Sequence, residues 1–354
     1  MTRLTRNYNI HDIFKFSITS NNYHVLNYVD KTYSFFRVDA IKNADLELIE
    51  GSFFPSIDNN IIINGKYYMG NNSLYCADSY KLSKWKVWIE HLDKNTKVHF
   101  SGDRIFSHWF LLRDILEPLM RYKLTFKGFS FIHSSCVGDR DNAYLFSACK
   151  GVGKTSTAMS LIERGLKLFS DDYTILSKNG DVFSFPCAIR LHGYNLDACP
   201  FLKNKLSLSN RFRIGIKEFI YNLSFHYANI TQDVNIREIF SEAEIGIKSP
   251  LKMLILFTKT NGDDISIKCA NSAELIQRLI IINKFEMSNF LDYLQAYSYA
   301  DPTNNATLYW DYEAKNFQIL SKIPCYEIAI PKKYTPQVFK SVEDFIAQNI
   351  SCFS

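Results

Sequence analysis

The sequence predicts an α/β fold preceded by a β-rich N-terminal domain, and three observations lead to this class. Residues 143–147 form an apolar, strand-like run, residues 155–164 carry apolar side chains at helical spacing, and a loop with two glycines joins them. Residues 1–100 contain short strand-like runs separated by turns rich in Asn, Gly, Asp and Lys. The chain has 354 residues, of which 47% are hydrophobic, so it is long enough to form two cores.

The domain boundaries follow from where these patterns change. Within the first 100 residues the expected strands are 23–28, 33–38, 61–69, 85–89 and 97–100. Between residues 101 and 122, apolar side chains recur at steps of four and three, which predicts a helix with one buried stripe and a kink at Pro118. The sequence therefore predicts a β-rich domain over residues 1–100, a helical connector over 101–126 and a second domain over 127–354.

Further elements are expected in the second domain. Residues 127–137 and 168–176 read as strands, and Asn179-Gly180 predicts a hairpin turn into the next strand. Asn261-Gly262 predicts a second hairpin, between strands 251–258 and 265–268. Asn271 precedes an apolar helical run that reaches residue 282, with Glu274 three positions on, which is the pattern of a capping box.

The glycine loop carries the strongest chemical signal. Residues 148–155 read Ala-Cys-Lys-Gly-Val-Gly-Lys-Thr, between the strand and the helix. Glycines let backbone N–H groups approach a polyphosphate, and the helix N-terminus adds the positive end of its dipole. In such a loop we expect Lys154 to reach the terminal phosphates and Thr155 to offer its hydroxyl to Mg²⁺. The residues expected to form the phosphate cradle are Lys150, Gly151, Val152, Gly153, Lys154, Thr155 and Ser156.

The loop departs from the usual pattern at its first position, where Ala148 stands in place of glycine. An alternative interpretation is a glycine turn that carries a surface lysine. On an exposed loop, replacing Lys154 by alanine is expected to change the free energy of unfolding by less than about 1 kcal/mol.

Two adjacent carboxylates follow the loop. Asp171 and Asp172 come 17 and 18 residues after Lys154, inside the strand-like run 168–176. Adjacent side chains on a strand point to opposite faces. If this strand lies beside the strand that leads into the loop, one carboxylate faces the phosphates and holds Mg²⁺, and the other faces away. The alternative is a surface turn, Ser-Asp-Asp.

These residues carry a resemblance to a known family. The span 133–176 resembles the catalytic domain of HPr kinase/phosphorylase and of the HPr-kinase-like peptide kinases found with lasso-peptide precursors, which share a P-loop core of mixed sheet with phosphoenolpyruvate carboxykinase. In that family the histidine, the Arg-Gly pair and the double aspartate lie at the same distances from the loop lysine. The matching residues are His133, Gly151, Gly153, Lys154, Thr155, Ala158, Leu161, Arg164, Gly165, Leu168, Asp171 and Asp172.

The resemblance implies roles for single residues. Lys154 is expected to bind the β- and γ-phosphates of ATP, and Thr155 and Asp171 to hold Mg²⁺. One of Asp171 and Asp172 is expected to accept the proton of the attacking hydroxyl, and which of them does so stays open. His133 is expected at the mouth of the site, with a hydrogen-bonded strand histidine as the alternative.

The family's later Glu-x-Arg-Gly signature is missing from this sequence. The nearest candidate is the run 185–191, in which Arg190 is expected to contact phosphate; a structural arginine is the alternative.

The resemblance implies an ATP-dependent, HPr-kinase-like serine kinase that transfers the γ-phosphoryl group to a hydroxyl, most often serine of a protein or peptide. Two alternatives are a small-molecule kinase on the same core and a non-catalytic nucleotide-binding regulator. The Asp171-Asp172 pair argues against the regulator, because a pure binder needs no base on the acceptor side. We expect the N-terminal domain to help select the acceptor, with the covering of apolar kinase surface as the alternative.

Composition excludes other classes of protein. The formal net charge is +5 and no basic run alternates with aromatic residues, so we expect no nucleic acid partner. The sequence has neither a secretory signal nor an apolar run of membrane-spanning length, so we expect a cytoplasmic protein without a membrane partner. The eight cysteines include no Cys-x-x-Cys pair, which argues against a zinc site. Assembly as a homo-oligomer stays open.

Overall fold

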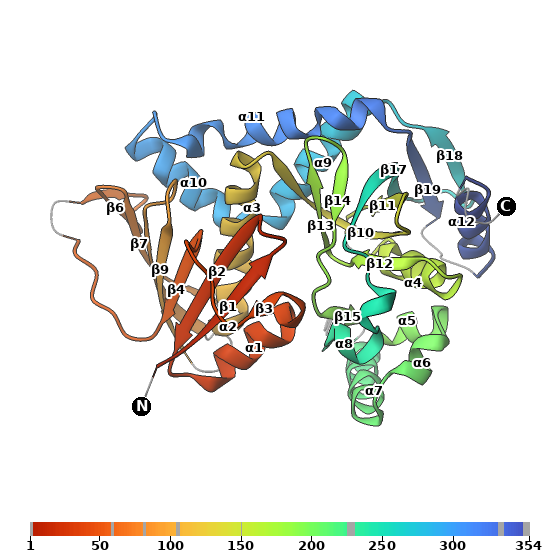
Figure 1. The fold of residues 1–354 in the computed structure, drawn as a ribbon, viewed down its shortest axis with the longest axis horizontal. Helices are drawn as coiled ribbons and strands as arrows, with labels where there is room; N and C mark the ends of the chain where they lie inside the picture. Colours follow the sequence, from red (N-terminus) through yellow and green to blue (C-terminus); the bar gives the residue numbers. More distant parts are fainter. Residues whose placement is uncertain are drawn as a thin grey trace. The chain divides into compact units, whose positions relative to one another are not determined.

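The computed structural model describes residues 3–57, 60–80, 83–103, 107–149, 151–224, 231–331 and 336–349, and Figure 1 shows the course of the chain. The protein belongs to the mixed α/β class. It divides into two compact units: unit 1 comprises Met1–Ser130 and Asn283–Asn316, and unit 2 comprises Phe131–Ile282 and Phe317–Ser354.

Unit 1 is built on a nine-stranded sheet with the order β3-β1-β2-β4-β9-β8-β7-β6-β5. The central strands β2, β4 and β9 pair in parallel, and the flanking pairs are antiparallel. In β2, alternate residues such as Phe14, Phe16 and Ile18 are buried, as expected of a strand that turns one face to a core. The strands are β1 Leu4–Ile10, β2 Phe14–Ser20, β3 Arg37–Val38, β4 Leu46–Glu50, β5 Ile61–Ile63, β6 Tyr67–Gly70, β7 Ser73–Tyr80, β8 Ser83–Glu90 and β9 Thr96–Gly102.

The helices of unit 1 include one that the sequence analysis assigned wrongly. Residues 23–28, expected as a strand, begin helix α1 (Tyr23–Tyr33). The side chain of Asn22 caps this helix by accepting a hydrogen bond from the backbone N–H of His24. Its buried residues Val25, Leu26, Val29 and Tyr33 recur at helical spacing, so burial on one side of a helix outweighs the β-propensity of the run.

The predicted connector is part of the core of unit 1. It consists of α2 (Ser107–Phe110), a π-helical segment (Leu111–Leu116) and α3 (Glu117–Phe126). The π-helical segment runs directly into α3, so Pro118 lies inside a continuous helix, where it cannot donate to the preceding turn; the irregular segment ends just before it. Ile105 of the predicted stripe lies outside the described residues.

Residues 283–316, which the sequence analysis placed in the second domain, belong to unit 1 in the structure. They hold all of α10 (Ser288–Ala300) and all but the last residue of α11 (Asn305–Phe317). Tyr297 of α10 donates a hydrogen bond to the backbone oxygen of Ile89, 3.1 Å away in β8. Tyr293 packs edge-on against Tyr67 of β6, with ring centroids 5.5 Å apart. Such contacts far apart in the chain leave no local signal in the sequence.

Unit 2 holds an eight-stranded sheet in which β11 pairs with both β10 and β17. The strand order is β11-β10-β13-β14-β17-β19-β18, and β12 pairs with β10 outside this path. The strands are β10 Phe129–Gly138, β11 Ala143–Ser147, β12 Lys167–Ser170, β13 Tyr173–Ser177, β14 Asp181–Phe183, β17 Lys248–Thr260, β18 Ser266–Cys269 and β19 Cys325–Pro331. A short ladder joins β15 (Ile189–Leu191) to β16 (Gln232–Val234).

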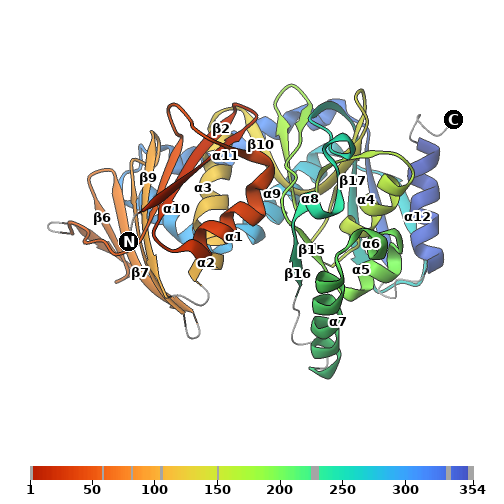
Figure 2. The same ribbon diagram turned by 60° about the horizontal axis from the view of Figure 1, so that its bottom comes forward.

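The helices of unit 2 surround this sheet, and Figure 2 shows α5, α6 and α7 grouped at one end of the unit. They are α4 Lys154–Glu163, α5 Gly193–Ala198, α6 Phe201–Lys205, α7 Leu208–Leu223, α8 Ile236–Ile239, α9 Ser272–Glu286 and α12 Pro336–Asn349. The core includes Ile132 of β10, Leu145 of β11, Leu254 of β17 and Leu279 of α9.

Local turn signals in unit 2 give mixed results. The hairpin at Asn179-Gly180 is confirmed: Gly180 has a φ of 91° and joins β13 to its antiparallel neighbour β14. The cap at Asn271 is also confirmed, since its side chain accepts from the backbone N–H groups of Ala273 and Glu274. The hairpin predicted at Asn261-Gly262 is wrong, because β19 lies between β17 and β18 and pairs with both.

Candidate active site

The glycine loop runs from the end of β11 to the start of α4 (Figure 1). Gly151 has a φ of 76° and Gly153 a φ of 101°, both in the left-handed region that residues with a Cβ rarely adopt. Gly153 caps α4, so the backbone turns directly into the helix. A larger residue at position 153 would disturb this turn through backbone strain. Lys150, which the sequence analysis placed in the cradle, lies outside the described residues.

Lys154, the first residue of α4, is buried, with 8% of its surface exposed. Its Nζ donates to the backbone oxygens of Ala148, at 2.8 Å, and Cys149, at 3.3 Å. The same Nζ lies 3.1 Å from Nε2 of His133 on β10. The expectation of an exposed lysine is therefore wrong: because the side chain turns back over the loop, its ammonium group is held against the loop's own carbonyls.

The two aspartates lie in a turn between β12 and β13, so the continuous strand predicted over 168–176 is wrong. Asp172 has a φ of 87°, a left-handed conformation that aspartate tolerates better than most residues. The backbone oxygen of Asp172 accepts a hydrogen bond from the N–H of Ser134, which anchors the turn to β10. The acids also do not follow a strand beside β11, because β10 lies between β11 and the strands that flank the turn.

Asp171 is buried and contacts the start of α4. Its carboxylate accepts hydrogen bonds from Oγ of Ser135, at 2.5 Å, and from Oγ1 of Thr155, at 3.0 Å. Burial raises the pKa of Asp171, and the nearby Asp172 raises it further, whereas the Ser135 and Thr155 hydrogen bonds and the Lys154 charge lower it. The structure thus brings the two predicted metal ligands, Thr155 and Asp171, into direct contact.

Asp172 lies between two cationic or ionisable partners. Its Oδ2 is 3.0 Å from a guanidinium nitrogen of Arg190 on β15, and its Oδ1 is 3.6 Å from Nδ1 of His133. A quarter of the Asp172 side chain is exposed, so it is more accessible than Asp171. The Nε2 atom of His133 faces Lys154 and its Nδ1 atom faces Asp172. The imidazole ring therefore lies between the lysine of the glycine loop and the aspartate turn.

The two remaining cradle residues face the protein. Val152 is buried, and Oγ of Ser156 accepts a hydrogen bond from Nδ2 of Asn195, 3.1 Å away in α5. Sequence reasoning missed Asn195, for which no spacing rule existed. It also missed Ser135, which the period of two along β10 could have found, because residues 133 and 135 lie on the same face of a strand.

Thr155 and Asp171 are the residues of this cluster that could contribute oxygen ligands to a metal ion. Among the residues that the structure describes, no three His, Cys, Asp or Glu side chains form a cluster that could hold a metal ion. Mg²⁺ usually keeps several waters and takes one or two carboxylates together with substrate phosphates. Thr155 supplies a hydroxyl and Asp171 a carboxylate, and their oxygens lie 3.0 Å apart. This is the number of protein ligands that such a magnesium ion takes.

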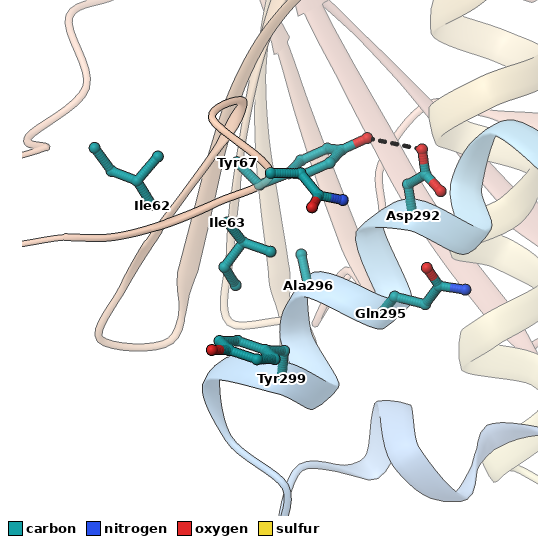
Figure 3. Close-up of a pocket in the computed structure, with 8 residues that line it drawn as sticks. Ile62, Ile63, Tyr67, Asp292, Gln295, Ala296 and Tyr299 are labelled. Atoms are coloured by element: carbon teal, nitrogen blue, oxygen red, sulfur yellow. Dashed lines mark hydrogen bonds between the residues drawn. The ribbon is translucent and has the colours of Figure 1, made fainter.

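A cavity lies within unit 1, between the β5–β6 hairpin and α10 (Figure 3). Its volume is about 360 Å³. Tyr67 donates a hydrogen bond to Asp292 across the cavity, at 3.1 Å. The lining residues are Ile62, Ile63, Asn64, Tyr67, Asp292, Gln295, Ala296 and Tyr299.

Across the described ranges, none of the helices combines the length and the apolar content that crossing a membrane requires.

Comparison with known proteins does not assign the chain to a family. No family model matches the chain, and no curated protein matches it in sequence. Among solved structures, the HPr(Ser) kinase/phosphatase from Coxiella burnetii is similar over 62% of this chain and 90% of that chain, with 11% sequence identity and a TM-score of 0.29. Similarity at this level establishes neither a shared fold nor a shared activity.

Proposed function

We propose that the protein is an ATP-dependent kinase that transfers a γ-phosphoryl group to a hydroxyl, with serine of a protein or peptide as the acceptor. One observation carries this proposal: the loop lysine, the Thr155–Asp171 pair and the Asp172–Arg190 pair converge at the N-terminus of α4. Phosphoryl transfer is catalysed chiefly by positioning and by neutralising charge, and these groups are suited to both tasks.

The phosphate side of the reaction falls to the loop and α4. The left-handed glycines turn the loop into the helix, whose N-terminal N–H groups and dipole attract phosphate. Lys154 lies within this turn and would neutralise the terminal phosphates. Mg²⁺ bound with ATP neutralises phosphate charge, and Thr155 and Asp171 are the residues that would hold it.

The acceptor side falls to Asp172. It is the more exposed of the two acids, and Arg190 and His133 fix its position. We assign Asp172 as the group that accepts the proton of the attacking hydroxyl, and Asp171 as the carboxylate on the metal side, because Asp171 already contacts Thr155. Arg190 would contact the transferred phosphate from the same direction.

Unit 1 is the proposed site of acceptor selection. Strand β5 ends the sheet order, so among the described residues no strand covers its outer edge, and Ile61 and Ile62 on it are exposed. An extended peptide can add to such an edge and place a side chain in a neighbouring pocket, here the cavity beside Tyr67. Deleting residues 1–100 would not test this role, since it removes the sheet against which α10 packs.

The test is ATP consumption with Mg²⁺, measured with and without a library of serine-containing peptides, and with radiolabelled ATP to detect phosphopeptide. The proposal predicts peptide-dependent ADP formation. Replacing Ile62, exposed on β5, with glutamate is expected to raise the KM for the peptide and leave ATP binding unchanged. Nucleotide binding without turnover on any acceptor would instead favour the regulator, and transfer only to sugars or other small alcohols would favour the small-molecule kinase.

A further inference from the structure

Helix α7 carries an apolar face that turns away from its own unit. Its inner side is fixed by Asn210 and Ile214, which are buried, and by Lys217, whose Nζ donates to the backbone oxygen of Thr231 at 2.6 Å. The outer side chains are exposed by 39–80%. They form the α7 stripe, which consists of Leu208, Phe212, Ile216, Phe219, Ile220 and Leu223. In both views α7 extends beyond the neighbouring helices of unit 2 (Figures 1 and 2).

The spacing of the α7 stripe is that of a helix-pairing seam. Phe212, Ile216, Phe219 and Leu223 follow one another at steps of four, three and four residues, as apolar residues do where two helices pack lengthwise. None of the stripe residues is charged, and the charged side chains of α7 fall outside the stripe. A surface helix of a globular protein normally turns such an apolar seam toward the core. An exposed seam of this kind indicates a surface that binds another molecule.

The area of the α7 stripe is large for a monomer surface. Six large side chains at these exposures present on the order of 600 Å² of apolar surface. A stable protein–protein interface buries about 800 Å² on each partner, so one helix supplies most of it. Contiguous apolar patches of more than a few hundred Å² mark interaction sites.

The order of residues in the stripe indicates which partner it fits. Leu208 and Leu223 stand at its ends, Phe212 and Phe219 stand equally far inside them, and the midpoint falls between Gly215 and Ile216. Apart from Ile216 and Ile220, the stripe therefore reads the same from either end. In an antiparallel pair of identical helices related by a two-fold axis, residue i of one copy faces residue j of the other and j faces i, so this spacing sets leucine against leucine and phenylalanine against phenylalanine.

We propose that α7 packs antiparallel against α7 of a second copy of this chain, forming a homodimer whose two-fold axis passes beside Ile216. Leu208 then lies on Leu223 of the second copy, and Phe212 lies on Phe219 of the second copy. Gly215, beside the axis, has nothing within 4 Å of where a Cβ would stand, so the two backbones can approach closely there. Two such stripes facing each other would bury on the order of 600 Å² of apolar surface on each copy, which is most of what a stable dimer needs.

The first experiment measures the mass of the full chain by sedimentation and light scattering over a wide concentration range. The expected mass is twice the 41.1 kDa of one chain. The double variant Phe212→Glu/Phe219→Glu is expected to be monomeric and to stay folded, because both side chains are exposed on the single chain. The matched control is Phe285→Glu on α9: this phenylalanine is 69% exposed, against 70% and 66% for Phe212 and Phe219, and its replacement should leave the dimer intact.

The second experiment uses single cysteines to establish the orientation. Ile216→Cys is expected to give a disulfide-linked dimer on mild oxidation, above the background of the native chain. Leu208→Cys alone is expected to give none, since the two copies of position 208 lie roughly 22 Å apart along an antiparallel pair. Mixing Leu208→Cys with Leu223→Cys should restore the link.

Three results would overturn the proposal. A monomeric mass at every concentration would contradict the homodimer. Binding of that monomer to vesicles containing anionic lipid would then assign the α7 stripe to a membrane surface. A dimer that survives Phe212→Glu/Phe219→Glu places the interface elsewhere. Self-linking of Leu208→Cys shows a parallel pair and contradicts the antiparallel two-fold.

Discussion

Replacing Lys154 with alanine removes the one ammonium group that lies inside the glycine loop in the described part of the chain. The native Nζ donates to the backbone oxygens of Ala148 and Cys149, at 2.8 and 3.3 Å, and lies 3.1 Å from Nε2 of His133. The substitution therefore acts on two properties at once: the loop loses a hydrogen-bond donor, and the site loses a charge. The two effects have different sizes and can be measured separately.

The stability effect follows from the burial of the lysine. A hydrogen bond to a charged group contributes about 1.5–3 kcal/mol, and Ala148, which loses its donor, is fully buried. Part of this loss is offset, because removing a mostly buried ammonium also removes its desolvation cost. We expect the free energy of unfolding to fall by about 2 kcal/mol, which lowers the melting temperature by about 2–4 °C for each kcal/mol. A truly exposed lysine would give less than about 1 kcal/mol.

The activity effect is expected to be much larger. A cation placed against the transferred phosphoryl group is worth on the order of 10³ in rate, so turnover of Lys154→Ala should fall by at least that factor. Lys154→Gln keeps a donor for the Ala148 oxygen and should recover stability without recovering turnover. The control is Lys167→Ala, which replaces an exposed lysine of the same unit at the start of β12.

The assays are ADP formation, calorimetric titration of ATP with Mg²⁺, and thermal melting. Turnover of Lys154→Ala within tenfold of the native rate, in a protein that melts normally, would refute the assignment of this loop to phosphate binding. A loss of turnover in Lys167→Ala of similar size would show that the assay reports general damage.

Two further predictions concern acidic residues. Asp171→Asn and Asp172→Asn should both lower turnover by about 10² or more, but only Asp171→Asn should weaken Mg²⁺-dependent ATP binding. Equal, mild losses of turnover in both variants would show that the two aspartates only form a structural turn. In unit 1, burial raises the pKa of Glu313 to about 7 from the usual 4.5, so the folded state keeps its proton while the unfolded state ionises. Stability should therefore fall as pH rises from 4.5 to 7, by up to about 3 kcal/mol, and Glu313→Gln should remove that slope in denaturant titrations between pH 5 and 8; identical slopes would contradict this.

Sequence reasoning located the loop because its signal is local. The strand expected at 143–147 and the helix expected at 155–164 appear in the structure as β11 and α4, within one residue at each end. Both elements are contiguous in sequence, and glycines at fixed offsets mark the turn between them. The hairpin at Asn179-Gly180 and the cap at Asn271 succeeded for the same reason.

What the sequence could not provide is pairing over long distances. The turn at Asp171-Asp172 divides an apolar run that has strand character on both sides, and the turn is attached to Ser134 on β10, far away in the chain. Likewise, α10 belongs to the core of unit 1 although about 150 residues of unit 2 precede it in the chain. Residues 23–28 were assigned wrongly for a different reason: a short apolar run can form a strand or a helix, and here burial along one side of the helix, with the cap at Asn22, favours the helix.

Strand β10 explains why residues far apart in sequence form one cluster. It pairs with β11, which leads into the loop, and with β12, which leads into the aspartate turn. His133 and Ser135, two positions apart on this strand, contact Lys154 and Asp171 respectively. A shift of β10 by one residue would turn both side chains to the opposite face and break both contacts together. The register of this strand therefore determines whether Lys154 and Asp171 are held in one cluster.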